Sequence, residues 1–170
     1  PPSQDICLAE VHIFTDGSGD SRTASKFSHA GWGFVVDTGA THFGPVSTSC
    51  NSPLYVGAHV ASNNTAELMA FLESIMWAQR HLDSSHHFHI HSDSKYAVAM
   101  TTGKHRAASN KHLVAPLRSA FLLASQIHRI SLRWVKAHAG VAGNQAADAA
   151  ANQGRIGEVS GTYRQLASHP

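Results

Sequence analysis

Four acidic residues of this 170-residue chain stand in distinctive local settings, although aspartate and glutamate together number only eleven. Asp16 and Asp93 end apolar or aromatic runs typical of β-strands, whereas Glu67 and Asp148 open runs with helical spacing. Carboxylates at strand ends and helix starts can converge on one edge of an α/β sheet. They repel one another unless divalent cations neutralise them, and Mg²⁺ favours such all-oxygen sites. The pattern therefore predicts a metal-dependent enzyme that acts on a phosphate group.

The segments around these residues match, in order, the motifs of a known nuclease family. The four read Thr-Asp-Gly-Ser at 15–18, Asn-Asn-Thr-Ala-Glu-Leu at 63–68, Ser-Asp-Ser at 92–94, and one longer stretch with Trp-Val-Lys-Ala-His-Ala-Gly at 134–140 followed by Gly-Asn-Gln-Ala-Ala-Asp at 143–148. On these motifs the chain resembles type 1 ribonuclease H, roughly over residues 9 to 153. One such motif occurs by chance in many loops, whereas four in sequence are specific.

The resemblance implies an α/β ribonuclease H-like fold. Its five-stranded mixed sheet would have three antiparallel and then two parallel strands, with helices on both faces. Alternating apolar residues and turn signals predict strands at 10–14, 30–36, 41–47, 88–92 and 130–134. Helical spacing indicates helices at 68–76, 95–100 and 117–127, and an alanine-rich helix that Asn144 would cap. Pro116 fits a first helical turn, so the third helix is expected to begin near Ala115.

Length and composition are consistent with one domain that has a sizeable core. We expect an extension at residues 1–8, the catalytic domain at 9–154 and a flexible tail at 155–170. No apolar run approaches the roughly 20 residues of a membrane helix, and the first residues lack the features of a signal peptide. Two cysteines, Cys7 and Cys50, in different contexts favour a reduced protein inside the cell, in the cytoplasm or nucleus.

The resemblance also implies roles for the four carboxylates and one histidine. Asp16, Glu67, Asp93 and Asp148 would hold two Mg²⁺ ions, which Mn²⁺ could replace, for hydrolysis of the RNA strand of an RNA–DNA hybrid. The products would carry 5′-phosphate and 3′-hydroxyl ends. Asp16 is expected to bridge both ions, because it ends the predicted central strand. His138 stands where the family has a mobile histidine, which implies proton transfer or help with product release.

Contacts with the hybrid are expected beside the carboxylates. The corresponding residues of the family approach the minor groove and its 2′-hydroxyls, which distinguish RNA from DNA. Ser62 stands where relatives often have a threonine that holds a DNA-strand phosphate, but Val60 replaces an arginine found in some of them. The predicted nucleic-acid contacts are Gly17, Ser18, Ser62, Asn63, Asn64, Lys95 and Asn144.

Each acidic motif also has a purely structural interpretation. Asn64 and Glu67 have the spacing of a capping box, Asp16 and Asp93 could form turns, and Asp148 could favour a helix dipole. These interpretations do not explain why the four occur together, so an active site is favoured. Two functional alternatives are an inactive ribonuclease H fold that only binds, which a lost carboxylate would indicate, and a DNA nuclease or integrase of the same broad fold.

The segment from Asp93 to Asn110 is too short for the basic, tryptophan-rich helix and loop that many cellular relatives use to grip the hybrid. Ribonuclease H domains attached to reverse transcriptases lack it too. Residues 50–61 look like an insertion. With a net charge of only +2 and no initiating methionine, these features favour a domain from a reverse-transcriptase polyprotein, such as that of a non-LTR retrotransposon, which would be a monomer when isolated.

Histidine is frequent, with fourteen in the chain, and four of them (His86, His87, His89 and His91) precede Asp93. Residues 87, 89 and 91 share one strand face, which makes a zinc or copper site conceivable. Successive side chains on one face of a straight strand are about 7 Å apart, too far to meet at one ion without a partner element. No specific metal site is therefore predicted there, although protonation of this strand at low pH is expected to weaken the fold.

Overall fold

A five-stranded sheet organises the part of the chain that the structure, a computed structural model, describes: residues 7–19, 28–81, 85–137 and 140–160. The strand order is β3-β2-β1-β4-β5. β2 (Ala30–Val36) pairs antiparallel with both β1 (Ala9–Gly19) and β3 (Thr41–Pro45), whereas β4 (His86–Ser92) and β5 (Arg129–Trp134) run parallel to β1. The predicted mixed sheet with a central first strand is confirmed.

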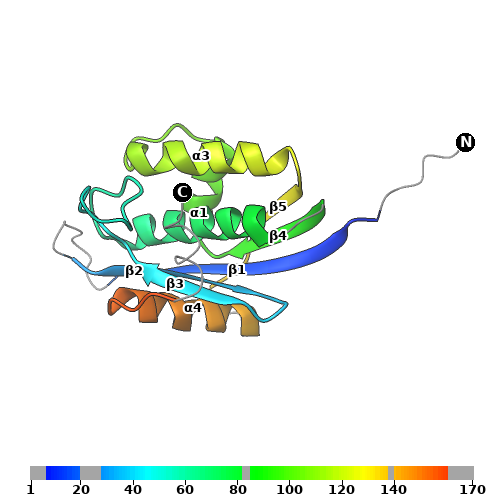
Figure 1. Cartoon of the computed structure of the whole chain (residues 1–170), viewed down its shortest axis with the longest axis horizontal. Coiled ribbons are helices and arrows are strands. Elements are labelled where there is room, and N and C mark those ends of the chain that lie inside the picture. The colour runs from blue at the N-terminus through cyan, green and yellow to red at the C-terminus, as the bar shows by residue number, and fades with distance from the viewer. Residues whose placement is uncertain (1–6, 20–27, 82–84, 138–139, 161–170) are drawn as a thin grey trace, which may run out of the picture.

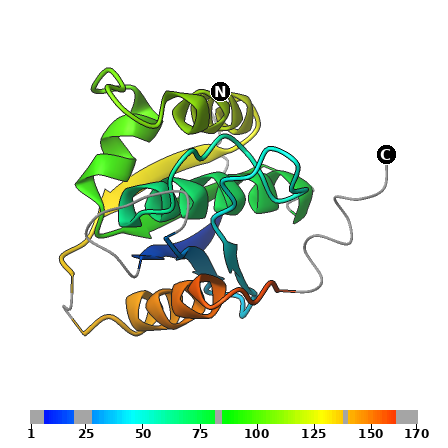
Figure 2. The same ribbon diagram turned by 90° about the vertical axis from the view of Figure 1, so that its left-hand side faces the viewer.

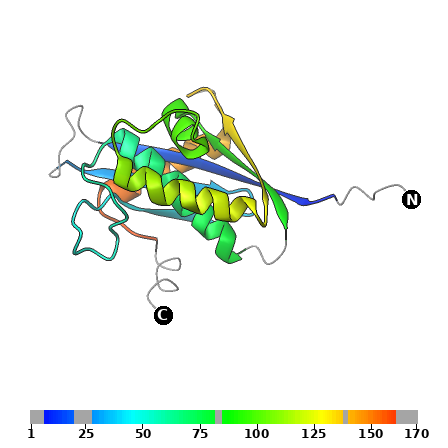
Figure 3. The ribbon, with the colours of Figure 1, turned by 90° about the horizontal axis from the view of Figure 1, so that it is seen from above.

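Helices cover both faces of the sheet, as predicted. α1 (Asn63–His81), α2 (Lys95–Thr102) and α3 (Lys111–Ser125) lie on one side, and α4 (Ala142–Arg155) lies on the other, as Figure 1 and Figure 2 show. Figure 3 shows α3 beside α1 over the sheet, and β1 extending beyond the helices toward its N-terminal end. Among the described helices, none is long and apolar enough to cross a membrane.

The main core lies between the sheet and α1. Ile13 and Ile90 from β1 and β4 and Phe34 from β2 point to this side and are fully buried against Phe71 and Ile75 of α1. Each such side chain stabilises the fold by roughly 1.5–3 kcal/mol relative to an exposed one. This burial holds α1 in place over β1, which is the contact that positions the candidate site described below.

β1 continues further than predicted. Its pairing with β4 stops at Phe14, opposite His91, but its pairing with β2 continues through Asp16, opposite Gly33, to Gly19. Asp16 therefore does not end the strand, and that prediction was wrong. At Asp16, β1 pairs only with the antiparallel strand β2, because its pairing with the parallel strand β4 has already ended at Phe14.

A capping box opens α1, but with residues other than the predicted pair. The N–H of Thr65 donates to the hydroxyl of Ser62 (3.1 Å), and the N–H of Ser62 donates to the hydroxyl of Thr65 (2.8 Å). Because the helix begins at Asn63, Glu67 lies in its second turn. The capping interpretation of Asn64 and Glu67 is therefore wrong, and the carboxylate of Glu67 plays no part in this capping box.

α3 begins at Lys111, four residues before the predicted start, so Pro116 lies inside the helix rather than in its first turn. Proline has no N–H to donate to the carbonyl oxygen of His112 one turn earlier. Gly57, whose own φ is 114°, lies against that oxygen, and a Cβ on Gly57 would overlap it. The helix also starts early because Leu113 is fully buried and anchors its first turn.

α4 begins at Ala142, with Val141 rather than the predicted Asn144 at the N-cap. β2 has the predicted limits, and those of β3, β4, β5 and α2 lie within two residues of the predicted ones. After α4, the N–H of Ser160 donates to the carbonyl of Phe43 in β3 (3.0 Å). The described part of the predicted tail, residues 155–160, is thus attached to the sheet, and the predicted domain limits stay a prediction.

Histidine rings line the face of β1 and β4 on the side of α4. The ring of His12 in β1 stacks on that of His89 in β4, with centroids 4.6 Å apart, and that of Phe14 stacks on His91 at 4.6 Å. Burial and neighbouring histidines lower the pKa of His89 and lower that of His91 to about 4. The stability that the neutral ring of His91 contributes is present above its ordinary pKa of 6.5 and lost as the pH falls through about 4. The lowered pKa of His89 acts in the same direction, which supports the expected weakening at low pH.

Candidate active site

Three of the four predicted carboxylates meet where β1 passes the start of α1. One oxygen from each of Asp16, Glu67 and Asp93 lies within 4.8 Å of the other two. Asp16 belongs to β1, Glu67 to the second turn of α1, and Asp93 follows the last residue of β4. Three elements that are distant in the sequence thus bring their acidic side chains together, and this group is a possible metal-binding cluster.

The fourth carboxylate, Asp148, approaches this group from the α4 side of the sheet. It lies on α4 and lines a small cavity together with Asp16 and Asp93. The cavity is completed by Thr15, Ala137, Gly140, Val141, Asn144 and Gln145. His138, predicted for proton transfer, lies outside the described residues, but its neighbour Ala137 belongs to this lining.

Close approach of β1 to α1 places Glu67 beside Asp16. A Cβ on Gly17 would lie 2.5 Å from the backbone nitrogen of Glu67 and 2.8 Å from the Cβ of Ala66, so only glycine fits there. The next residue is held by the opposite layer, because the hydroxyl of Ser18 bonds to the side-chain oxygen of Asn152 in α4 (2.7 Å). Both residues hold the layers together, and their predicted contacts with substrate stay a prediction.

Burial and repulsion from neighbouring charges make Asp16 and Glu67 hard to ionise in the cation-free protein. Burial raises the pKa of Asp16 to about 6, hydrogen bonds with Glu67 and Gly17 oppose the rise, and the charges of Asp93 and Asp148 add to it. Burial and then the charge of Asp16 raise the pKa of Glu67 well above its usual range. One oxygen of Glu67 is also buried with no hydrogen-bond partner among the described residues. Such a group is costly unless a cation neutralises it.

The raised pKa of Asp16 predicts how its removal changes stability with pH. In chelator, Asp16→Asn should raise the free energy of unfolding at pH 8 by about 1–2 kcal/mol, allowing for solvent screening. Because the folded pKa of about 6 exceeds the usual 3.8, the contribution of wild-type Asp16 is fully present below pH 3.8 and lost as the pH rises through 6. Urea unfolding between pH 4 and 8 measures the difference. A difference that grows toward pH 4 would contradict this account.

The other predicted nucleic-acid contacts lie in different environments, and of these Asn144 lines the cavity. Asn63 and Asn64 are exposed at the start of α1, whereas the hydroxyl of Ser62 takes part in the capping box. The side-chain oxygen of Asn144 is buried in the cavity with no hydrogen-bond partner among the described residues. Lys95 is exposed at the start of α2, with its Nζ 4.5 Å above the ring of Trp134.

Trp134 has a role beside the site that sequence patterns did not reveal. Its indole N–H donates to the backbone carbonyl of Asp93 (2.9 Å), and its side chain is 47% exposed, unlike most large apolar residues of the fold. The alternation of Ile130, Leu132 and Trp134 predicts only a strand. The position of Trp134 at the start of a matched motif was the one available signal.

Comparisons with known proteins point to one family. The RNase H family model matches residues 9–156. Ribonuclease HI of Rickettsia prowazekii (strain Madrid E) is 33% identical over 156 residues, covering 86% of this chain and 91% of the relative. Ribonuclease H of Verminephrobacter eiseniae (strain EF01-2) is 30% identical over 160 residues, with 86% and 91% coverage.

Solved structures share the fold. A crystal structure of LC9-RNase H1, a type 1 RNase H with the type 2 active-site motif, superposes with a TM-score of 0.64 at 22% identity, covering 97% of this chain and 83% of the other. RNase H1 from the halophilic archaeon Halobacterium salinarum NRC-1 gives 0.59 at 21% identity, covering 86% and 97%. At these identities the similarity establishes the arrangement of strands and helices.

Proposed function

The chain belongs to the ribonuclease H family and is an enzyme of that family, and from this premise we propose that it is an endonuclease that hydrolyses the RNA strand of RNA–DNA hybrids. The observation that carries the proposal is the meeting of Asp16, Glu67 and Asp93 beside a cavity that Asp148 lines together with Asp16 and Asp93. An inactive binding module would be indicated by a missing carboxylate, and all four are present.

The donor set of this cavity fits divalent cations. Its ligands are carboxylate oxygens, which suit Mg²⁺ and Mn²⁺ rather than softer metals. The unpartnered buried oxygen of Glu67 gives independent support, since a cation would satisfy it. We propose that Asp16, Glu67 and Asp93 hold one Mg²⁺, that Asp16 and Asp148 hold a second, and that Mn²⁺ can replace both.

Other residues of the chain would hold the cation-binding carboxylates in place for hydrolysis of the phosphodiester bond. When bound, the two cations would activate water for in-line attack on the scissile phosphate and stabilise the leaving 3′ oxygen, giving 5′-phosphate and 3′-hydroxyl ends. The N–H of Gly17 donates to a carboxylate oxygen of Asp16 (2.8 Å) and restricts its rotation. The hydrogen bond from Trp134 holds the backbone that carries Asp93. His138 is proposed to transfer a proton, since imidazole titrates near neutral pH.

Selection of the hybrid is proposed to depend on the exposed start of α1. Asn63 and Asn64 precede Glu67 on this helix, so a minor groove over the cavity would present 2′-hydroxyls to their amide groups. Lys95, exposed on the neighbouring α2, would contact phosphate. DNA lacks the 2′-hydroxyl, so these contacts would favour cleavage of the RNA strand.

Parallel cleavage of labelled RNA–DNA, RNA–RNA and DNA–DNA duplexes of one sequence tests the proposal. We expect the RNA strand of the hybrid alone to be cut, in Mg²⁺ or Mn²⁺ but not in chelator. The ends are checked by extension of the 3′-hydroxyl with a polymerase and by ligation of the 5′-phosphate. Cleavage of the DNA duplex would favour a DNA nuclease, and hybrid binding without cleavage in either metal would favour a binding module.

The cellular context is a separate matter. The relatives named above are bacterial ribonucleases H, and this chain covers 91% of the length of each. They do not support the retroelement context, which rests mainly on the short segment from Asp93 to Asn110 and stays a prediction. The intracellular location and the monomeric state stay predictions as well.

A further inference from the structure

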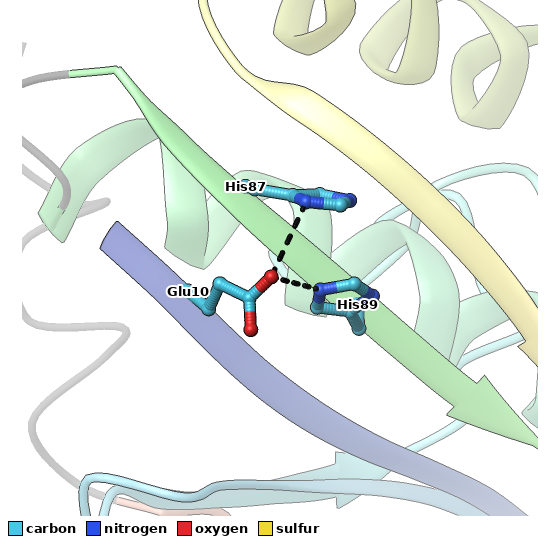
Figure 4. A group of neighbouring side chains, drawn as sticks. All are labelled: Glu10, His87 and His89. Atoms are coloured by element: carbon cyan, nitrogen blue, oxygen red, sulfur yellow. Dashed lines mark ion pairs between the residues drawn. The ribbon is translucent and has the colours of Figure 1, made fainter. Parts of the chain in front are cut away.

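A second group of possible metal ligands lies near the start of β1, on the sheet face that carries the histidine rings. Oε1 of Glu10 is 3.7 Å from Nδ1 of His87 and 3.6 Å from Nε2 of His89, and the three atoms lie within 4.8 Å of one another. Figure 4 shows the carboxylate of Glu10 on β1 pointing toward both rings on β4. Glu10 precedes Asp16 by six strand residues, about 20 Å at 3.3 Å per residue, so this group is separate from the carboxylate cavity.

The sequence-based objection to a metal site on this strand does not hold in the folded chain. Residues on one strand face were expected to be too far apart, but the rings of His87 and His89 incline toward each other until their centroids are 4.0 Å apart. The missing partner element is β1, because its pairing register places Glu10 opposite His87. Parallel pairing of two strands therefore supplies the third ligand.

We propose that Glu10, His87 and His89 bind one divalent cation of the zinc class. Two imidazole nitrogens and one carboxylate oxygen form a donor set that suits Zn²⁺ and its neighbours better than Mg²⁺. With bonds of about 2.0–2.2 Å, two ligands of one tetrahedral ion are about 3.3 Å apart, so the distances from Glu10 need to shorten by only a few tenths of an ångström. The Glu10 side chain is 61% exposed, which gives the ion a route in and leaves room for water as a fourth ligand.

Ser131 orients His87 for this role. Its hydroxyl lies 2.7 Å from Nε2 of His87 and can accept the N–H of that nitrogen. The proton of the neutral ring is then on Nε2, and the lone pair of Nδ1 faces the carboxylate of Glu10. A hydrogen-bonded second nitrogen is the usual way in which metal-binding histidines are oriented. A lone pair facing a carboxylate is repulsive unless a cation lies between them.

Arg133 competes with the cation for His89. Its Nε–H donates to Nδ1 of His89 (2.9 Å), so the neutral ring carries its proton on Nε2, whose nearest described acceptor, Oε1 of Glu10, lies 3.6 Å away, just beyond hydrogen-bond distance. Metal binding at Nε2 needs that proton to shift to Nδ1, and two N–H donors would then face each other. Arg133 is exposed and can turn away, so loading of the site breaks this hydrogen bond.

Titration of the full chain with Zn²⁺ in excess Mg²⁺ tests the proposal, because the excess Mg²⁺ is added to fill the carboxylate site that is proposed above to bind it. We expect one saturable site in the wild type, and Glu10→Gln and His87→Gln should weaken it more than Ser131→Ala, for which loss of an orienting partner predicts about 10–100-fold. Arg133→Met should bind more tightly than the wild type. Equal affinity in the wild type and His87→Gln, or weaker binding in Arg133→Met, would overturn the proposal.

A matched control tests whether zinc affinity depends on these particular histidines or only on how many histidines the chain contains. His59 and His112 are exposed and form another pair of adjacent rings, with centroids 4.5 Å apart, and replacing both with Gln should leave the affinity unchanged. His89 is buried, so replacing it would disturb the packing of the sheet. Its role is therefore measured in the wild-type protein. Zinc should shift the ¹⁵N resonances of His87 Nδ1 and His89 Nε2, and shifts confined to other rings would overturn the assignment.

Discussion

Replacing Asp16 with Asn is expected to reduce hydrolysis of the hybrid by at least about 10²–10³-fold, the scale for losing one group that stabilises charge at a reacting centre. Asp16 interacts electrostatically or by hydrogen bonding with Glu67, Asp93 and Asp148, and it is the one residue shared by the ligand sets proposed for the two cations. Its neutralisation should lower cation occupancy and misplace the attacking water. The measurement is kcat and KM for one labelled hybrid over a range of Mg²⁺ concentrations.

The variant must stay folded for this result to be interpreted. Asp16→Asn relieves repulsion in the cation-free protein, so its free energy of unfolding at pH 8 should not fall. Asp37→Asn is the matched control, because Asp37 is exposed in the turn after β2 and loses the same charge outside the cavity. Near-normal turnover of Asp16→Asn in Mg²⁺ would show that the carboxylate cavity is not the active site.

Local sequence patterns predicted the limits of those strands and helices that begin and end at signals in their own sequence. β2 was predicted at its observed limits because an apolar run ends at the turn around Gly39, which has a φ of 107°. The end of β1 was missed because Gly17 and Gly19 resemble a loop in isolation. They are in a strand only because β2 pairs with them, and that pairing is a property of the folded sheet.

The two groups of possible metal ligands also differ in whether local sequence patterns could reveal them. Asp16, Glu67 and Asp93 could be selected from the sequence because each lies in a family motif, and the structure brings them together. The group that includes Glu10 and His87 could not be found that way, because it depends on which residue of β1 lies opposite which residue of β4. Register between strands that are distant in the sequence is not encoded in any local pattern.

Gly17→Ala is expected to lower both stability and turnover, although it removes no charge and no hydrogen-bonding group. The new Cβ would lie 2.5 Å from the backbone nitrogen of Glu67, and a helix backbone cannot rotate aside as a side chain can. β1 and α1 must therefore separate, at a cost of about 1–3 kcal/mol in the free energy of unfolding. Separation moves Glu67 away from Asp16, and a misplacement of about 1 Å can slow turnover on the order of 10²-fold.

Gly39→Ala distinguishes this displacement from a general loss of stability. Gly39 has a φ of 107°, so alanine is strained there, but its Cβ would have no heavy atom within 4 Å. Urea unfolding and kcat of both variants should show a loss of stability in each and a loss of turnover in Gly17→Ala alone. If Gly17→Ala loses stability but keeps its kcat, then the contact between β1 and α1 supports the fold without positioning Glu67 for catalysis. If both variants lose turnover in parallel with stability, the effect comes from partial unfolding, and the close approach at Gly17 has no specific link to the site.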